Sequence, residues 1–89
     1  MRAVITVIGK DMVGILAGVS NICVNRKVNI IEVTQSIMQD MFAMIMMVDI
    51  SGSDVPFATL SEDLSQFGEE NALSVHIMHE DIFNSMHRI

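Results

Sequence analysis

The hydrophobic positions along this chain change their period several times, and each change marks a predicted element. Residues 2–9, RAVITVIG, are mostly β-branched and apolar on both faces, which predicts a short strand that Gly9 ends. From residue 13 to residue 27 the apolar positions fall at helical spacing, and Asp11 just ahead is a suitable N-cap. The chain is therefore expected to open with a strand followed by a helix.

Residues 28–38 and 41–50 read as two neighbouring strands. The first alternates, which is typical of a half-buried edge strand. Residues 39–40 are short enough for a tight turn, and 41–50 is an almost continuous apolar run, as expected of a central strand covered on both faces. The alternation assigns the first strand's residues to two faces: Ile31, Val33, Gln35 and Ile37 on one, and Ile30, Glu32, Thr34 and Ser36 on the other.

A loop at residues 51–56 separates this hairpin from the second half of the chain. Pro56 suits the first turn of a helix that Ser53 or Asp54 would cap, and Gly68 is expected to stop that helix. Residues 72–80 alternate enough for a fourth strand. The tail, residues 81–89, carries apolar positions on one helical face and reads as a short helix; these are Ile82, Phe83, Met86 and Ile89.

The element order is therefore β-α-β-β-α-β with a short C-terminal helix, in a single domain of residues 1–89. This order predicts an α+β protein with a ferredoxin-like βαββαβ sandwich. Right-handed crossovers give an antiparallel four-stranded sheet of order 4-1-3-2, with two helices on one face.

The apolar content is large for a chain of 89 residues. Hydrophobic residues make up 51% of the sequence, more than a small interior can absorb, so some apolar surface is expected to face a second chain. No apolar run approaches the ~18 residues that span a bilayer, and no signal-peptide cleavage pattern is present. A cytoplasmic protein without membrane attachment is expected.

The charge balance argues against nucleic acid as a partner. The formal net charge is −6, and the five basic residues are scattered, so no cationic patch faces a phosphate backbone. The single cysteine, Cys23, excludes an intrachain disulfide and a Cys-rich zinc site, and its apolar neighbours indicate a buried packing residue. No local nucleophile–base set is visible, so neither an enzyme nor a cofactor is expected.

The candidate metal ligands cluster near the C-terminus. They are His76, His79, Glu80 and His87. On a strand, positions 76 and 79 point to opposite faces, so we expect no native metal site. The methionines at positions 41, 44, 46 and 47 are interpreted as core residues rather than as a metal-binding stripe.

Two segments, VIGKDMVGILAGVS (7–20) and VNIIEVTQS (28–36), resemble the ACT domain, a regulatory amino-acid-sensing module. Its first loop has the form Asp-x-x-Gly-[Ile/Leu]-[Leu/Val], and its second strand opens with an Asn-Ile pair. The chain is similar to small stand-alone bacterial ACT proteins and to the ACT repeats of a glycine-cleavage repressor. Val13 stands where the family commonly has proline. The matching residues are Asp11, Gly14, Ile15 and Leu16 in the loop, and Asn29 and Ile30 in the strand.

The resemblance implies a non-enzymatic regulatory module that binds a small amino acid at a homodimer interface and signals to an unidentified protein partner. The helix N-terminus suits a carboxylate, and Asp11 suits an ammonium group. The dimer would join either side by side through the edge strand or face to face. The predicted ligand-binding residues are Asp11, Met12, Val13, Gly14, Ile15, Leu16, Asn29 and Ile30.

Simpler roles exist for the same residues. Asp11 can be a plain N-cap, Gly14 can let the helix approach the sheet, and Asn29 can merely start a strand. The corresponding alternative function is a ligand-free interaction subunit that uses its apolar sheet face and the 81–89 tail. A response to amino acids distinguishes the two.

Overall fold

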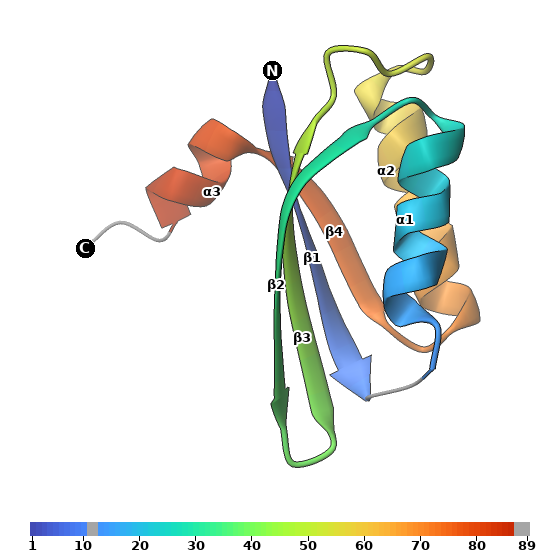
Figure 1. Cartoon of the computed structure of the whole chain (residues 1–89), viewed down its shortest axis with the longest axis vertical. Coiled ribbons are helices and arrows are strands. Elements are labelled where there is room, and N and C mark those ends of the chain that lie inside the picture. Colours follow the sequence, from blue (N-terminus) through green and yellow to red (C-terminus); the bar gives the residue numbers. More distant parts are fainter. Residues whose placement is uncertain (11–12, 87–89) are drawn as a thin grey trace.

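The computed structural model describes residues 1–10 and 13–86 and confirms the predicted order of elements (Figure 1). The four strands form one antiparallel sheet in the order β2-β3-β1-β4, which is the predicted topology. The elements are β1 (Arg2–Lys10), α1 (Ile15–Asn25), β2 (Asn29–Met38), β3 (Met41–Asp49), α2 (Phe57–Glu70), β4 (Ser74–His79) and α3 (Glu80–Met86).

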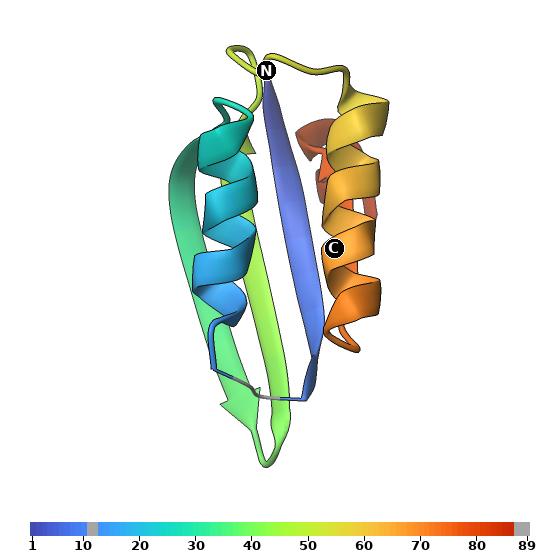
Figure 2. The same ribbon diagram turned by 90° about the vertical axis from the view of Figure 1, so that its right-hand side faces the viewer.

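The two long helices pack side by side on one face of the sheet (Figure 2). The core lies between this helix layer and the sheet, and Cys23 belongs to it, as predicted. α3 lies on the opposite side of the sheet, which we call the open face (Figure 1). The largest fully buried side chains are Ile5, Met44, Met46, Leu60 and Leu64.

A β-bulge near the start of β2 corrects the predicted faces of that strand. The pairing with β3 shifts between Ile30 and Glu32, so Ile31 is an extra residue. Ile30 and Val33 therefore both face the helix layer and pack against the core, whereas the alternation had placed them on opposite faces. Ile31 is 46% exposed.

Two glycines predicted to end elements lie inside them. Gly9 pairs with Phe42 within β1, and the side chain of Leu73 packs directly over its Cα. Gly68 lies within α2, which continues to Glu70. Both predictions were wrong for one reason: each glycine makes room for a neighbouring segment and does not interrupt its own element.

The helix caps also differ from the predicted ones. The N-cap of α1 is Gly14 and not Asp11, a residue that lies outside the described part of the chain. The N-cap of α2 is Pro56, while the Ser53 hydroxyl donates to the carbonyl oxygen of Val55 at 2.9 Å.

The open face of β3 is less covered than its continuous apolar sequence predicted. Met41 and Ile45 are 45% and 42% exposed, so Met41 is not the core residue that was expected. Met44 and Met46 point the other way, into the core. Within residues 1–10 and 13–86, no helix has the length and apolar character needed to cross a membrane.

Candidate functional site: a helix start and a strand edge

Gly14 forms the turn between β1 and α1. Its φ is +89°, a left-handed conformation that residues with a Cβ rarely adopt, and it is the N-cap of α1. A Cβ built there would meet no atom of the described residues within 4 Å. The backbone conformation therefore accounts for the glycine, and no contact with a described residue of the sheet does so. Val13, next to it, is 98% exposed.

The first turn of α1 presents backbone donors to its surroundings. The N–H of Gly18 donates to the carbonyl oxygen of Gly14 at 2.8 Å, which begins the helical hydrogen-bond pattern. No side chain among residues 1–10 and 13–86 caps the N–H groups of this first turn. This first turn contains no acidic residue. The helix start therefore carries the partial positive charge that suits an anion.

The predicted hydrophobic ligand contacts next to this start have different exposures. Ile15 is 2% exposed and belongs to the core, so it anchors the helix and offers no surface to a ligand. Leu16 is 38% exposed and is accessible at the helix start. Asp11 and Met12, two further predicted ligand-binding residues, lie outside the described part of the chain.

Asn29 and Ile30 lie at the opposite end of the same protomer. Asn29 pairs with Asp49, in the row that also contains Arg2, whereas the loop follows Lys10 at the other end of β1. The nine residues of β1 give a separation of ~26 Å between these two ends. One protomer therefore does not bring the two halves of the predicted site together (Figure 1).

Asp49 is the acidic group beside Asn29. The backbone N–H of Ser51 donates to its Oδ1 at 2.9 Å and holds the pKa of this carboxyl below its ordinary value. The N-terminal ammonium of Met1 lies 3.5 Å from the same oxygen and adds a smaller effect in the same direction.

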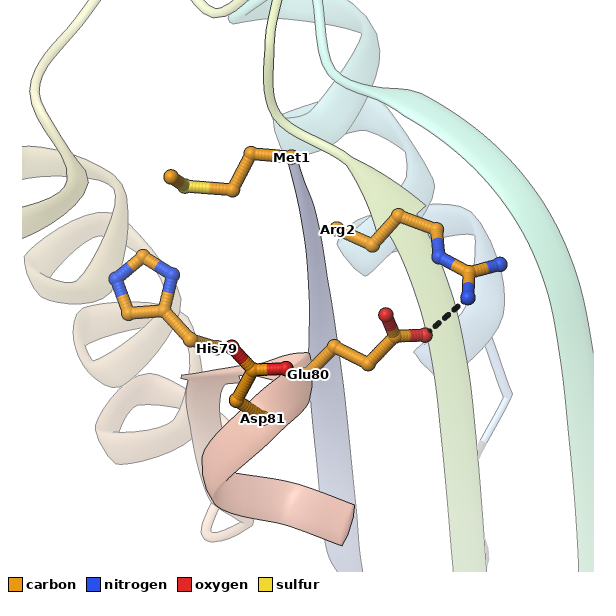
Figure 3. A pocket seen from close by; sticks show the side chains of 5 residues that line it. All are labelled: Met1, Arg2, His79, Glu80 and Asp81. Carbon is orange, nitrogen blue, oxygen red and sulfur yellow. Dashed lines mark ion pairs between the residues drawn. The ribbon is translucent and has the colours of Figure 1, made fainter.

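A cleft that no sequence motif predicted lies at the same end of the sheet (Figure 3). It has a volume of about 420 Å³, and the Arg2 guanidinium and the Glu80 carboxylate point toward each other across it at 2.5 Å. The ring of His79 stacks on Phe57 with centroids 4.6 Å apart. The ion pair and the stack fix the connection between β4 and α3.

No group of potential metal ligands comes together within residues 1–10 and 13–86. His76 faces the open side with Thr6, and His79 faces the helix side with Ala3, as the strand period predicted. His76 Nε2 lies 3.1 Å from the Ser74 hydroxyl. His87 lies outside the described part of the chain.

Cys23 is fully buried on α1, and burial raises the pKa of its thiol to about 11. A thiol with a raised pKa is protonated near neutral pH, and the thiolate is the nucleophilic form. Cys23 is therefore a packing residue in the described structure, as its neighbours in the sequence indicated.

The antiparallel order β2-β3-β1-β4 with two helices on one face defines the ferredoxin-like class of folds. The turn at Gly14 and the edge strand β2, which carry the two matching motifs, narrow the choice of family within this class. The ACT domain model matches residues 2–78, so the chain belongs to the ACT domain family, as its motifs indicated.

The chain is also similar to curated proteins and to solved structures. The UPF0237 protein of Methanocaldococcus jannaschii is 50% identical over 88 residues, which cover 99% of this chain and 98% of that protein. The solved ACT domain protein of Streptococcus pneumoniae is 34% identical with a TM-score of 0.80, and 93% of each chain is covered. A putative glycine cleavage system transcriptional repressor has the same fold, with a TM-score of 0.70 at 24% identity over 86% of this chain and 44% of that one.

Proposed function

We propose that this protein is a non-enzymatic regulatory module that binds a small amino acid between two copies of the chain. The observation that carries the proposal is the separation of the two site halves by ~26 Å, nearly the length of β1. The start of α1 and the start of β2 belong to one site only if they come from different protomers.

The edge of β2 supports a dimer of this kind. β2 is the outermost strand of the sheet, and it exposes Ile31, Ile37 and Met38 by 46%, 58% and 63%. An antiparallel pairing of two such edges satisfies backbone groups on both and removes an aggregation-prone edge. It also places the Asn29 end of one β2 beside the Met38 end of the other, which is the end where α1 begins.

The chemistry at this junction fits the two ends of an α-amino acid. The N–H groups at the start of α1, which no side chain of the described residues caps, suit the carboxylate, and Leu16 offers an exposed apolar contact. The side-chain oxygen of Asn29 accepts a hydrogen bond from the ammonium group. In the strand register the side chain of Ile30 faces the helix layer, whereas that of Asn29 faces the open side of the sheet. Asn29 therefore reaches the ligand from the end of β2. Asp11 is predicted as a second acceptor for the ammonium.

Ligand binding at a shared site stabilises the arrangement of two protomers that forms it. The free energy of binding adds to the free energy of association, and an unidentified protein partner senses the change in geometry or in dimer population. The localisation expected for such a module is the cytoplasm.

Calorimetry of the purified protein with each of the twenty amino acids tests the sensing function. Binding of at least one of them supports it. A folded, associated protein that binds none would instead support the ligand-free interaction subunit, which the exposed apolar residues Ile82 and Met86 of α3 also favour.

A subunit-mixing experiment tests the shared site directly. Gly14→Val disturbs the loop, Asn29→Ala removes the strand contact, and each variant alone is expected to lose amino-acid binding. In a 1:1 mixture, each heterodimer has one intact site and one doubly altered site, so ~25% of the wild-type binding capacity returns. No recovery after verified subunit exchange would contradict a site shared between protomers.

A further inference from the structure

α3 closes one end of the open face and leaves a hollow beside it (Figure 1). Val4 faces this side by strand register and lies outside the main core cluster, yet it is fully buried, because α3 contacts β1 and β4 there. On the same face of β1, Thr6 is half-buried and Ile8 beyond it is 51% exposed. The cover that α3 provides therefore decreases along β1, and the hollow begins where the cover ends.

The hollow has the size and the lining of a small-molecule site. Its volume is about 350 Å³, which gives room for roughly ten non-hydrogen atoms. Ligand pockets are commonly ~300–1,000 Å³ in volume and are lined mainly by apolar side chains, with a few polar groups that orient the ligand. The apolar lining here comes from three strands and from α3 and includes Ile8, Ala43, Ile45, Met78, Phe83 and Met86.

Two polar residues lie side by side in the sheet wall of the hollow. Thr6 on β1 and His76 on β4 are cross-strand partners, and both line it. The Ser74 hydroxyl lies 3.1 Å from Nε2 of His76, so one nitrogen of the ring already has a partner. The Thr6 hydroxyl makes no side-chain hydrogen bond within residues 1–10 and 13–86. This hydroxyl is therefore the polar group of the wall that is available to a ligand.

Formal charges lie outside the hollow. None of the described residues that line it is Asp, Glu, Lys or Arg. Glu32 lies on the open face beside Met47, but it belongs to the outer strand β2 and does not line the hollow. Glu80 and Asp81, at the start of α3, line the separate cleft that also contains Arg2. A charged ligand would lose its hydration without gaining an opposite charge, whereas an uncharged ligand has no such cost.

We propose that this hollow binds an uncharged, mainly apolar molecule of roughly ten non-hydrogen atoms that carries a single hydrogen-bonding group. The apolar body packs between Ile45 on the sheet and Phe83 and Met86 on α3. The polar group forms a hydrogen bond with the Thr6 hydroxyl, which can donate or accept. The hollow shares no lining residue with the amino-acid site of the proposed function, so either site can exist without the other.

Methyl NMR of the protein labelled at its methionines tests the proposal, with indole as the probe. Indole is uncharged, fits the volume and carries a single N–H donor. We expect saturable shifts of the Met78 and Met86 methyl signals, which report on the hollow, with a Kd of ~0.1–1 mM. Met38 is 63% exposed on β2 and does not line the hollow, so its signal is the internal control and should not move. Equal shifts of Met38 and Met78, or no shift at any soluble concentration of indole, would overturn the proposal.

Ala43→Leu fills the hollow, and Ala58→Leu is the matched control, because it makes the same change on the exposed surface of α2. Indole binding should weaken at least ~10-fold in Ala43→Leu and stay unchanged in Ala58→Leu. Amino-acid binding should be unchanged in both variants, so a failure of this site can be distinguished from a failure of the proposed function. Unchanged indole binding by a folded Ala43→Leu protein would place the probe elsewhere and refute the proposal.

Thr6→Val and indene test the hydrogen bond and do not depend on the filled variant. Valine keeps the shape of threonine without its hydroxyl, and indene keeps the shape of indole without its N–H. Thr6→Val should weaken indole binding ~2–10-fold and leave indene binding unchanged. The same loss for both probes, or for neither, would remove Thr6 from the site. Tighter binding of benzoate than of indole by the wild type would contradict an uncharged ligand.

Discussion

The ring of Phe67 on α2 lies directly against the backbone of Gly18 on α1, where the two helices contact each other. A Cβ at position 18 would overlap the ring edge. Gly18 therefore allows the two helices to share one layer over the sheet, and the ring of Phe67 fills the space that its missing side chain leaves.

Gly18→Ala should have opposite effects in two backgrounds. In the wild type, the overlap with Phe67 costs ~1–3 kcal/mol and exceeds the helix propensity gained by replacing glycine. In a Phe67→Ala background the overlap is absent, and Gly18→Ala should stabilise the protein by ~1 kcal/mol. Urea unfolding of the four proteins in this cycle measures both effects. Equal effects in the two backgrounds would show that the contact with Phe67 has no energetic weight.

Gly68→Ala should destabilise the protein more than Gly18→Ala does. A Cβ at position 68 would lie 2.7 Å from the carbonyl oxygen of Leu73 and 3.0 Å from Cγ2 of Val75. The carbonyl is backbone and cannot rotate away as a ring can, so a loss of ~2–4 kcal/mol is expected despite the gain in helix propensity. Thermal unfolding measures it, with Ser65→Ala on the exposed side of α2 as the control.

Substitutions at Gly14 should rank by their tolerance of a left-handed conformation. Asparagine adopts this conformation more readily than alanine, and valine adopts it least, so the losses should increase in the order Asn, Ala, Val. Gly14→Ala should cost ~1–2 kcal/mol, measured by urea unfolding. A Cβ at this position meets no atom of the described residues within 4 Å, so the order of the losses should follow the backbone conformation and not the size of the side chain. Equal losses for Asn and Val would contradict the assigned φ.

Cys23 should make the stability of the protein depend on alkaline pH. Its folded-state pKa of about 11 is raised above the ordinary 9.0, so the contribution is fully present below pH 9 and is lost as the pH rises toward 11. The unfolding free energy of the wild type should therefore fall more steeply over this range than that of Cys23→Ala. The thiol should also react with a disulfide reagent at the rate of unfolding at neutral pH. Fast labelling of folded protein would contradict its burial.

The order of elements and the sheet topology could be predicted from sequence because each element has its own hydrophobic period. The strand–helix–strand order and right-handed crossovers then leave few topologies. The roles of Gly9 and Gly68 could not be predicted, because a glycine that ends an element and one that admits a neighbour have the same local sequence. The bulge at Ile31 was missed for a similar reason, because one unpaired residue cannot be recognised in a sequence of alternating apolar and polar positions.

The candidate site residues could be named from motifs, but the distance between them within one protomer could not be predicted from those motifs. Gly14 and Asn29 are 15 positions apart in the sequence, and the length of α1 carries the chain to the other end of the sheet between them. The family resemblance placed the site at a homodimer interface, and the fold agrees with this placement in that it separates the two halves within a protomer. The cleft beside Arg2 and Glu80 is lined by residues from the first strand and from the C-terminal part of the chain, and no local sequence pattern predicts it.

The bulge in β2 has a consequence for how the length of this domain can vary. Ile30 pairs with Val48 and Glu32 with Met47, so removing Ile31 would leave every pairing with β3 in place. The core would keep its register, and the change would fall on the twist of the outer strand. Related domains can therefore gain or lose one residue at this point, and with it adjust how two edges fit together, without altering the interior.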